Sequence, residues 1–261
     1  MKTKSLIILV ALLIFRAEAQ TVLFDFENAP RYTSLPINLT VGGITAHFSA
    51  SGQGFSIQLV TVQGINPGGG FAGNCIYPNS VYAADLLVSF SKPLTAFSIL
   101  YATQELACDD SATMRVTAYM NGTPVGTSTA NSTPLCTCTY QANTLSITTT
   151  QAFNSVVVHY DAKPPTCQDW GPVFLADNMI VTPMPPILLT TPTKLTNAAF
   201  QFTFTNTPNY PFTVLGTTNL SLPFSNWTTL TGLTEAPPGQ FQFTDSHATN
   251  IPSRFYRVTS P

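Results

Sequence analysis

The sequence predicts an all-β protein, with a jelly-roll β-sandwich followed by a smaller β-sandwich. Two observations predict this class. Short segments alternate apolar and polar residues with a period of two, and no segment keeps a helical repeat beyond about ten residues. Turn-forming residues separate these segments, among them Asn121 and Gly122, which both accept the positive φ of a tight hairpin. Many short strands with frequent turns favour sandwiches.

Residues 1–19 have the pattern of a secretory signal peptide. Lys2 and Lys4 precede an apolar run at 6–15, and residues 17–19 form a small-x-small cleavage site. The apolar run is far shorter than the ~20 residues that span a bilayer, and no later segment approaches that length. We therefore expect a secreted, extracellular chain that begins near Gln20 and has no transmembrane segment.

The mature chain is weakly charged and acidic overall. Charged residues make up 8% of the sequence, against about a quarter in typical domains. Removing residues 1–19 leaves 7 of the 10 basic and 11 of the 12 acidic residues, a formal net charge of −4. We expect no nucleic-acid partner, because phosphate binding needs a dense basic surface.

A proline-rich passage divides the mature chain. Pro183, Pro185 and Pro186 cannot continue a β-ladder, and a threonine-rich stretch with another proline follows. We expect a jelly-roll domain over residues 20–182, a linker over 183–196 and a smaller sandwich over 197–261. The strands predicted in the first domain are 21–27, 86–90, 96–101, 114–119, 145–147, 154–160 and 174–181.

Four cysteines fall in loops at one end of the first domain. In an up-and-down arrangement of strands, these loops contain Cys108, Cys136, Cys138 and Cys167. With Cys75 the total is five, which predicts two disulfides and one unpaired thiol among about fifteen pairings. We favour a Cys108 to Cys167 bridge, because it would close two long loops. We expect no metal at Cys136 and Cys138, which lack a second ligand pair and a nearby histidine.

The same loops contain the residues that we expect to bind a ligand. Trp170 follows Asp169, and Asp109 and Asp110 follow Cys108 directly. An aromatic ring beside carboxylates is typical of sugar binding, which combines stacking with hydrogen bonds. The alternative interpretation is that Trp170 caps the core of the sandwich.

We expect no catalytic set. Secreted hydrolases need a nucleophile with a base, or two carboxylates at a working distance. His47 and His159 lie in predicted strands, His247 lies in the second domain, and the Gly-x-Ser-x-Gly motif is absent. Glu105 and the aspartates of the loops are the remaining candidates for paired carboxylates, and a solvated loop or a cation site is the alternative.

The two ends of the first domain each carry a carboxylate. In the opening Phe-Asp-Phe-Glu at 24–27 we expect Phe24 and Phe26 to face one side, and Asp25 and Glu27 the other. Asp177 lies in the last strand, so Glu27 and Asp177 would share a hard cation such as Ca²⁺ through oxygen ligands. Solvation or turn capping is the alternative.

These ends resemble those of MAM and galactose-binding-like jelly-roll domains, including lectin-like domains of secreted bacterial proteins. The resemblance rests on the opening Phe-Asp-Phe-Glu and on the closing Leu-Ala-Asp-Asn-Met-Ile-Val at 175–181. It implies a structural cation at Glu27 and Asp177.

Four motifs of the second domain lie in order at 212–220, 225–230, 241–245 and 254–258. They resemble the small Ig-like module, with a terminal "RFYRV", at the C-termini of secreted proteins of Verrucomicrobia and related bacteria. The resemblance implies an Ig-like sandwich without catalytic residues. From their residue types we expect Trp227, Phe241, Phe243 and Phe255 to form its core.

These expectations favour a secreted, non-enzymatic binding protein that recognises a glycan or a cell-surface component through the loop end of the first domain. A structural surface or matrix protein without a small ligand is the alternative. An extracellular polysaccharide hydrolase, or an accessory protein of one, is the third hypothesis.

Overall fold

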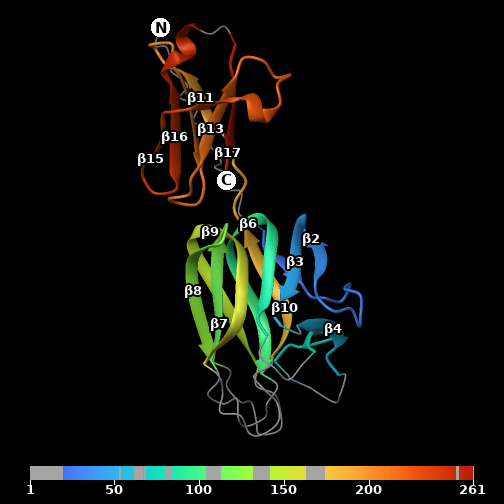
Figure 1. Ribbon diagram of the computed structural model, residues 1–261. Helices are drawn as coiled ribbons and strands as arrows, with labels where there is room; N and C mark the ends of the chain where they lie inside the picture. The colour runs from blue at the N-terminus through green and yellow to red at the C-terminus, as the bar shows by residue number, and fades with distance from the viewer. Residues whose placement is uncertain are drawn as a thin grey trace, which may run out of the picture.

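A computed structural model describes residues 20–52, 54–61, 67, 69–79, 84–103, 113–131, 142–162, 174–250 and 253–260. The chain is all-β, as the sequence predicts, and forms two sandwiches in tandem (Figure 1). The strands of the first are β1 (Val22–Phe24), β2 (Ile37–Val41), β3 (Ile44–Ala50), β4 (Phe55–Leu59), β5 (Asn74–Pro78), β6 (Leu86–Thr103), β7 (Thr113–Met120), β8 (Thr123–Asn131), β9 (Ala142–Ala162) and β10 (Phe174–Pro183).

The second sandwich contains seven strands and two short 3₁₀ helices among the described residues. They are β11 (Thr190–Lys194), β12 (Phe200–Thr205), β13 (Thr213–Thr217), η3 (Phe224–Asn226), β14 (Thr228–Leu230), β15 (Leu233–Glu235), β16 (Gln240–Asp245), η4 (Ser246–Asn250) and β17 (Phe255–Thr259). Within the part of the chain that the structure describes, no helix has the length and apolar character needed to cross a membrane.

Two long strands, β6 and β9, form the centre of the first sandwich. The strand order is β4-β5-β10-β6-β9-β7-β8, with β1 on β10 and β2-β3 on β6. β6 joins two segments that the sequence predicts as separate strands, and so does β9. Figure 1 shows both strands arching over the end that faces the second sandwich. The polar residues of the arch, such as Ser91 and Lys92, interrupt the apolar alternation. The residue period therefore does not predict that the strand is continuous.

The ends of the first domain pair with each other. β1 lies antiparallel to β10, with Val22 opposite Val181 and Phe24 opposite Met179. The strand ends at Phe24, earlier than predicted, because the chain turns at Phe26, whose φ is 60°. Phe26 is nevertheless buried and packs edge-on against Phe48, with ring centroids 5.3 Å apart. The strand is therefore shorter than predicted, but Phe24 and Phe26 both enter the core while Asp25 and Glu27 are more exposed, as the alternation predicts.

The second sandwich consists of sheets β11-β12-β16-β15 and β14-β13-β17. β11 begins at Thr190 and pairs with β12, so this sandwich starts inside the segment expected to be linker. Its core contains stacked rings, including Phe204 and Phe241 with centroids 4.9 Å apart. Phe241 and Phe243 are buried there, as predicted.

Trp227 and Phe255 do not belong to this core, which corrects the prediction for both residues. Neither is in the buried cluster; Trp227 is half-buried and Phe255 is exposed. Trp227 lies between η3 and β14 and packs on Phe224 within the loop. The strand register explains the position of Phe255. Tyr256 and Val258 of β17 pack against the core, so the alternation of side chains directs Phe255 to the outer side of the sheet.

The connection between the sandwiches is hydrogen-bonded to both of them. The Met184 N–H donates to the Pro93 carbonyl at 2.9 Å, on the β6 arch. The Asn206 side chain donates to the Pro185 carbonyl at 3.0 Å from the second sandwich. Ala152 of β9 is buried in the apolar cluster of the second sandwich. This arrangement leaves the opposite end of the first sandwich remote from the second.

Candidate functional site

Chain-end pairing brings Glu27 and Asp177 into one cluster of side chains. Glu27 follows β1 by three residues, and Asp177 lies in β10 two residues before the partner of Phe24. One short segment contacts both carboxylates, because the Ala72 N–H donates to Asp177 and the Asn74 N–H donates to Glu27. A cation shared by the two residues stays a prediction.

Asp177 is held at a bulge in β10. The register against β6 shifts between Asp177 and Ile180, and Asn178 has a φ of 46°. This distortion lets both carboxylate oxygens accept backbone hydrogen bonds, Oδ1 from the Asn178 N–H at 2.7 Å and Oδ2 from the Ala72 N–H at 3.3 Å. The Asp177 residue is 1% exposed. Such burial of a carboxylate requires these donors.

Glu27 is held by the glycine-rich segment that enters β5. Its Oε1 accepts a hydrogen bond from the Asn74 N–H at 3.1 Å. A Cβ at Gly73 would collide with the Glu27 carboxylate, and the φ of Gly73 is 60°, so the position suits glycine on both grounds. The Asn74 amide donates to the carbonyls of Phe26 at 3.3 Å and Glu27 at 3.1 Å, which fixes the turn.

The electrostatics of this carboxylate cluster are unfavourable for charge. Burial, and to a lesser extent the charges of Glu27 and Asp25, raise the pKa of Asp177 to about 7 against the opposing effect of its two backbone hydrogen bonds. Burial followed by the charges of Asp177 and Glu27 raises the pKa of the Cys75 thiol to about 12. Arg31 directs its Nε to the Asn74 Oδ1 at 2.5 Å and pairs with neither carboxylate. The cluster thus has an excess of negative charge.

The donor set fits a hard cation in kind, because carboxylate and carbonyl oxygens are the ligands that Ca²⁺ takes. The number of carboxylate donors in this set is small. Over the described ranges, no group of three or more His, Cys, Asp or Glu side chains is arranged to hold a metal ion. Glu27 and Asp177 would therefore need carbonyl or water oxygens to complete a coordination shell, and Ca²⁺ at this position stays a prediction.

The predicted ligand-binding residues Trp170, Asp169, Asp109 and Asp110 lie outside the described residues, as do Cys108 and Cys167 of the predicted disulfide. The strand ends that flank their segments are described, and they converge. Neighbouring pairs at this end are Thr103 with Phe174, Ala102 with Ala142, Thr113 with Asn131 and Thr113 with Ala162. The prediction that these segments leave one end of the sandwich is confirmed by the strands that carry them.

Two tyrosines near this end belong to the core and do not extend a binding surface. Tyr101 is fully buried, and its hydroxyl donates to the Ala130 carbonyl at 3.1 Å. Tyr160 is half-buried and packs edge-on against Phe174, with ring centroids 6.1 Å apart. Both rings pack inside the sandwich, next to the ends of these strands.

Cys75 is an unpaired cysteine, fully buried in β5. The sequence could not decide which of the five cysteines is left over. Its strand places Cys75 in the apolar cluster with Val60 and Leu175, which suits the predicted unpaired thiol, and the two disulfides stay a prediction. The four other cysteines all fall in the segments that leave the common end.

The histidines do not assemble a catalytic triad in the described part of the chain. His159 Nε2 accepts a hydrogen bond from the Arg115 Nε at 2.8 Å, and burial followed by the Arg115 charge lowers the pKa of His159. His47 Nδ1 contacts the Asn38 Oδ1 at 2.7 Å. In the second domain, Asp245 accepts the backbone N–H of His247, so its carboxylate does not orient the ring.

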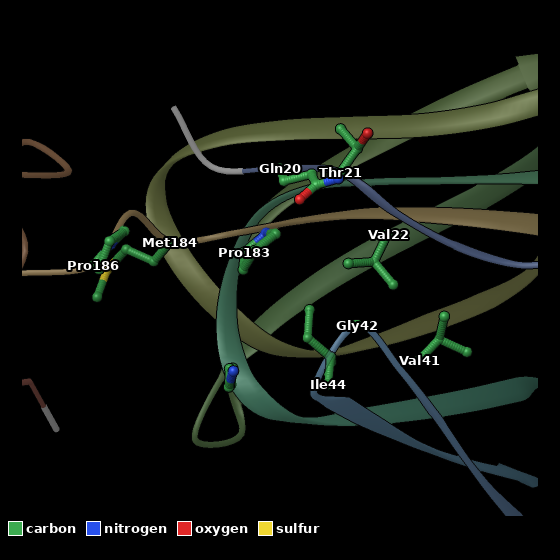
Figure 2. Close-up of a pocket in the computed structure, with 10 residues that line it drawn as sticks. Gln20, Thr21, Val22, Val41, Gly42, Ile44, Pro183, Met184 and Pro186 are labelled. Atoms are coloured by element: carbon green, nitrogen blue, oxygen red, sulfur yellow. The ribbon is translucent and has the colours of Figure 1, made fainter. Parts of the chain in front are cut away.

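A hollow of about 570 Å³ lies beside the linker, at the end of the first sandwich that faces the second (Figure 2). Figure 2 shows Val22 and Ile44 on its walls and Met184 of the linker at one side. Lys92 is the one charged side chain in its lining. No described group with a shifted pKa lines the hollow, so its chemistry is that of a shallow apolar surface.

Sequence reasoning found Glu27 and Asp177 but missed the segment that holds them. Ala72, Gly73 and Asn74 supply the amides and the space, and nothing in their local pattern refers to a carboxylate. The one available signal is the concentration of glycines at 68–70 and 73, which indicates close approach of backbone to another group.

Comparisons with known proteins identify no family. No protein-family model and no curated protein matches the chain. Among solved structures, a cleaved adhesin domain of Lys-gingipain from Porphyromonas gingivalis is similar over 63% of this chain and 98% of that one, at 14% identity and a TM-score of 0.34.

Two further structures are similar at the same low level. The tandem CBM22 domains of Xyn10C from Paenibacillus barcinonensis match 95% of this chain and 91% of theirs, at 8% identity and a TM-score of 0.29. A β-1,2-glucanase from Parabacteroides distasonis matches 82% of this chain and 34% of its own, at 9% identity and a TM-score of 0.29. Similarity at this level assigns neither a family nor a function.

Proposed function

We propose that the chain is a secreted, non-enzymatic binding protein that recognises a glycan or a cell-surface component through the loop end of its first sandwich. One observation supports this most directly. The strands that carry three long segments end together, as the pairs Thr103 with Phe174 and Thr113 with Ala162 require. Loops that leave one end of a rigid sandwich are the usual position of binding residues.

The chemistry of these segments indicates the ligand class. Trp170 would stack on a sugar ring, and Asp109, Asp110 and Asp169 would accept hydrogen bonds from its hydroxyls. The common end faces away from the second sandwich, so a large glycan or a cell surface would meet no obstruction from that domain.

The test is glycan-array binding of the secreted chain, followed by calorimetry on the best ligand. We expect Trp170→Ala to weaken binding at least about tenfold, because stacking contributes a large share of sugar affinity. Trp227→Ala, which removes the other tryptophan, is the matched control and should bind as the wild type does. Absence of array binding, or equal binding by both variants, would refute the proposal.

Two other classes make different predictions. A structural matrix protein would remain in the envelope fraction whatever sugars are added, whereas a glycan-binding protein would be released by its ligand. A hydrolase would turn over polysaccharides or esters and lose this activity in Asp109→Asn or Asp169→Asn.

A Ca²⁺ ion at Glu27 and Asp177 is part of the same proposal, with a structural role. Its support is the buried Asp177 carboxylate in one cluster with the exposed Glu27, which no described basic side chain neutralises. Bound Ca²⁺ would offset this repulsion and tie β10 to the turn after β1. We expect Ca²⁺, and Mg²⁺ much less, to raise the melting temperature of the wild type at pH 8. Glu27→Gln and Asp177→Asn should abolish the rise; a rise that persists in both variants places the ion elsewhere.

A further inference from the structure

An apolar surface on the second sandwich has no partner within the described chain. It consists of the loop between β13 and β14 together with the outer side of β17, and we call it the loop face. Its residues are Leu220, Leu222, Phe224, Trp227, Phe255 and Arg257. Leu220 is 60% exposed and Phe224 is 55% exposed. Large apolar side chains are rarely gathered in this way on a soluble surface without a reason.

The strand register places these residues on one side of the sheet. Phe255 lies opposite Thr217 and Arg257 opposite Leu215, and paired residues in a ladder point to the same side. The opposite side contacts the core through Val214 and Val258. The loop joins this outer side because Phe224 stacks beneath the Arg257 guanidinium, at 3.8 Å from ring centroid to Cζ.

The loop is ordered by its own contacts and still presents its apolar groups outward. The Trp227 Nε1–H donates to the Leu222 carbonyl at 3.2 Å, and the Trp227 and Phe224 rings are 5.3 Å apart at an angle of 60°. The indole N–H is therefore already used inside the loop. What remains exposed is the leucine side chains and one side of the Phe224 ring.

The segments that form the loop face carry basic residues and no exposed acidic ones. No acidic residue occurs between Thr213 and Thr234 or after Asp245. Asp245 itself is buried and paired with Arg254 at 2.8 Å. Arg257 is exposed and has no ion pair among the described residues. An occupant that combines apolar groups with negative charge would therefore match this surface.

We propose that the loop face docks on an anionic lipid surface. Leu220, Leu222 and Phe224 would enter the boundary between headgroups and acyl chains, while Arg257 contacts phosphate groups. A sugar ring fits the surface less well, because leucines do not stack on sugars and the guanidinium already covers one face of Phe224. This proposal is independent of the loop end of the first sandwich and gives the second domain a role in attachment.

The experiment is flotation of the secreted chain with vesicles of phosphatidylcholine, with and without phosphatidylglycerol. We expect binding that is stronger with phosphatidylglycerol. Leu220→Ser combined with Phe224→Ser should lower the partition coefficient by at least about tenfold, because each side chain loses much of its apolar transfer. Arg257→Gln should lower it about fivefold on the anionic vesicles alone. Leu188→Ser combined with Leu189→Ser is the matched control, because both leucines are exposed on the linker.

Tryptophan fluorescence gives an independent readout of the same event. The chain has two tryptophans, so Trp170→Phe leaves Trp227 as the reporter, and its emission should shift to shorter wavelength on anionic vesicles. The proposal is overturned if no vesicle binds the chain, or if the loop variant floats as the linker control does. It is also overturned if the loop face is covered by a second copy, seen as a dimer that Leu220→Ser with Phe224→Ser dissociates, or by a soluble acidic polysaccharide without flotation.

Discussion

Replacing Asp177 by asparagine should remove a loss of stability that the first sandwich otherwise undergoes as the pH rises. The raised pKa of about 7 in the folded chain compares with about 3.9 for an unfolded aspartate. Between these values the folded state binds more protons than the unfolded state. The stability that the neutral carboxyl contributes is complete below pH 3.9 and is lost as the pH rises through 7.

The magnitude follows from the same two values. Raising the pH from 5 to 9 lowers the free energy of unfolding by about 3 kcal/mol, because folded Asp177 binds more protons than unfolded Asp177 over about two pH units of this range. In a domain of this size that corresponds to a fall in melting temperature of about 6–12 °C. The side chain of the Asp177→Asn variant carries no charge at either pH, so the variant should lack this part of the loss. Its amide loses one backbone hydrogen bond, at about 1 kcal/mol, at both pH values.

The assay is thermal unfolding at pH 5 and pH 9 in EDTA, which removes divalent cations. A Trp227→Phe background leaves Trp170, which belongs by sequence to the first domain, as the fluorescent reporter. Asp161→Asn is the control for loss of one negative charge, because Asp161 lies in a surface pair with Arg115 at 3.0 Å. Parallel pH curves for Asp177→Asn and the wild type would refute the reasoning.

Three further predictions concern single sites. Gly73→Ala should destabilise the first sandwich by about 1–2 kcal/mol through its positive φ, plus displacement of the Glu27 carboxylate; denaturant unfolding should show a smaller cost in a Glu27→Ala background. Cys75 should resist alkylation in the native chain, because burial raises the pKa of its thiol to about 12, and should react on unfolding; mass spectrometry finding native labelling would contradict this. Arg254→Met should lower the free energy of unfolding by about 3–5 kcal/mol, because it removes the cation partner of the buried Asp245. Arg257 has no such partner, so Arg257→Met is the control. Equal stability of the two variants in urea unfolding would contradict this prediction.

Burial of Cys75 leaves four cysteines for the two predicted disulfides. Two disulfides among the remaining four cysteines leave Cys136 with Cys138 if Cys108 pairs with Cys167. Those two are separated by one residue, and so short a loop gains little from closure. Pairing of Cys136 and Cys138 with the two outer cysteines would instead tie three segments together. Peptide mapping of the oxidised chain distinguishes these arrangements.

Local pattern determined a large part of the architecture. Alternation of apolar residues identified most strands of the first sandwich, and Asn121-Gly122 identified the hairpin between β7 and β8. It failed where polar residues occur inside a continuous strand, as at the arches of β6 and β9. It also failed for Trp227, which lies in a loop, and for Phe255, because residue type indicates a preference for burial and not the position that the fold gives a residue.

The sequence by itself determined the all-β class and the two sandwiches and predicted Glu27 and Asp177 as a pair, because each depends on residue period or on the pairing of chain ends. Only the tertiary structure decided what surrounds that pair. The amides of Ala72 and Asn74 come from a segment more than forty residues after Glu27, and the burial that raises the pKa of Asp177 comes from long-range packing. Such contacts depend on the register of distant strands, which a local pattern does not specify.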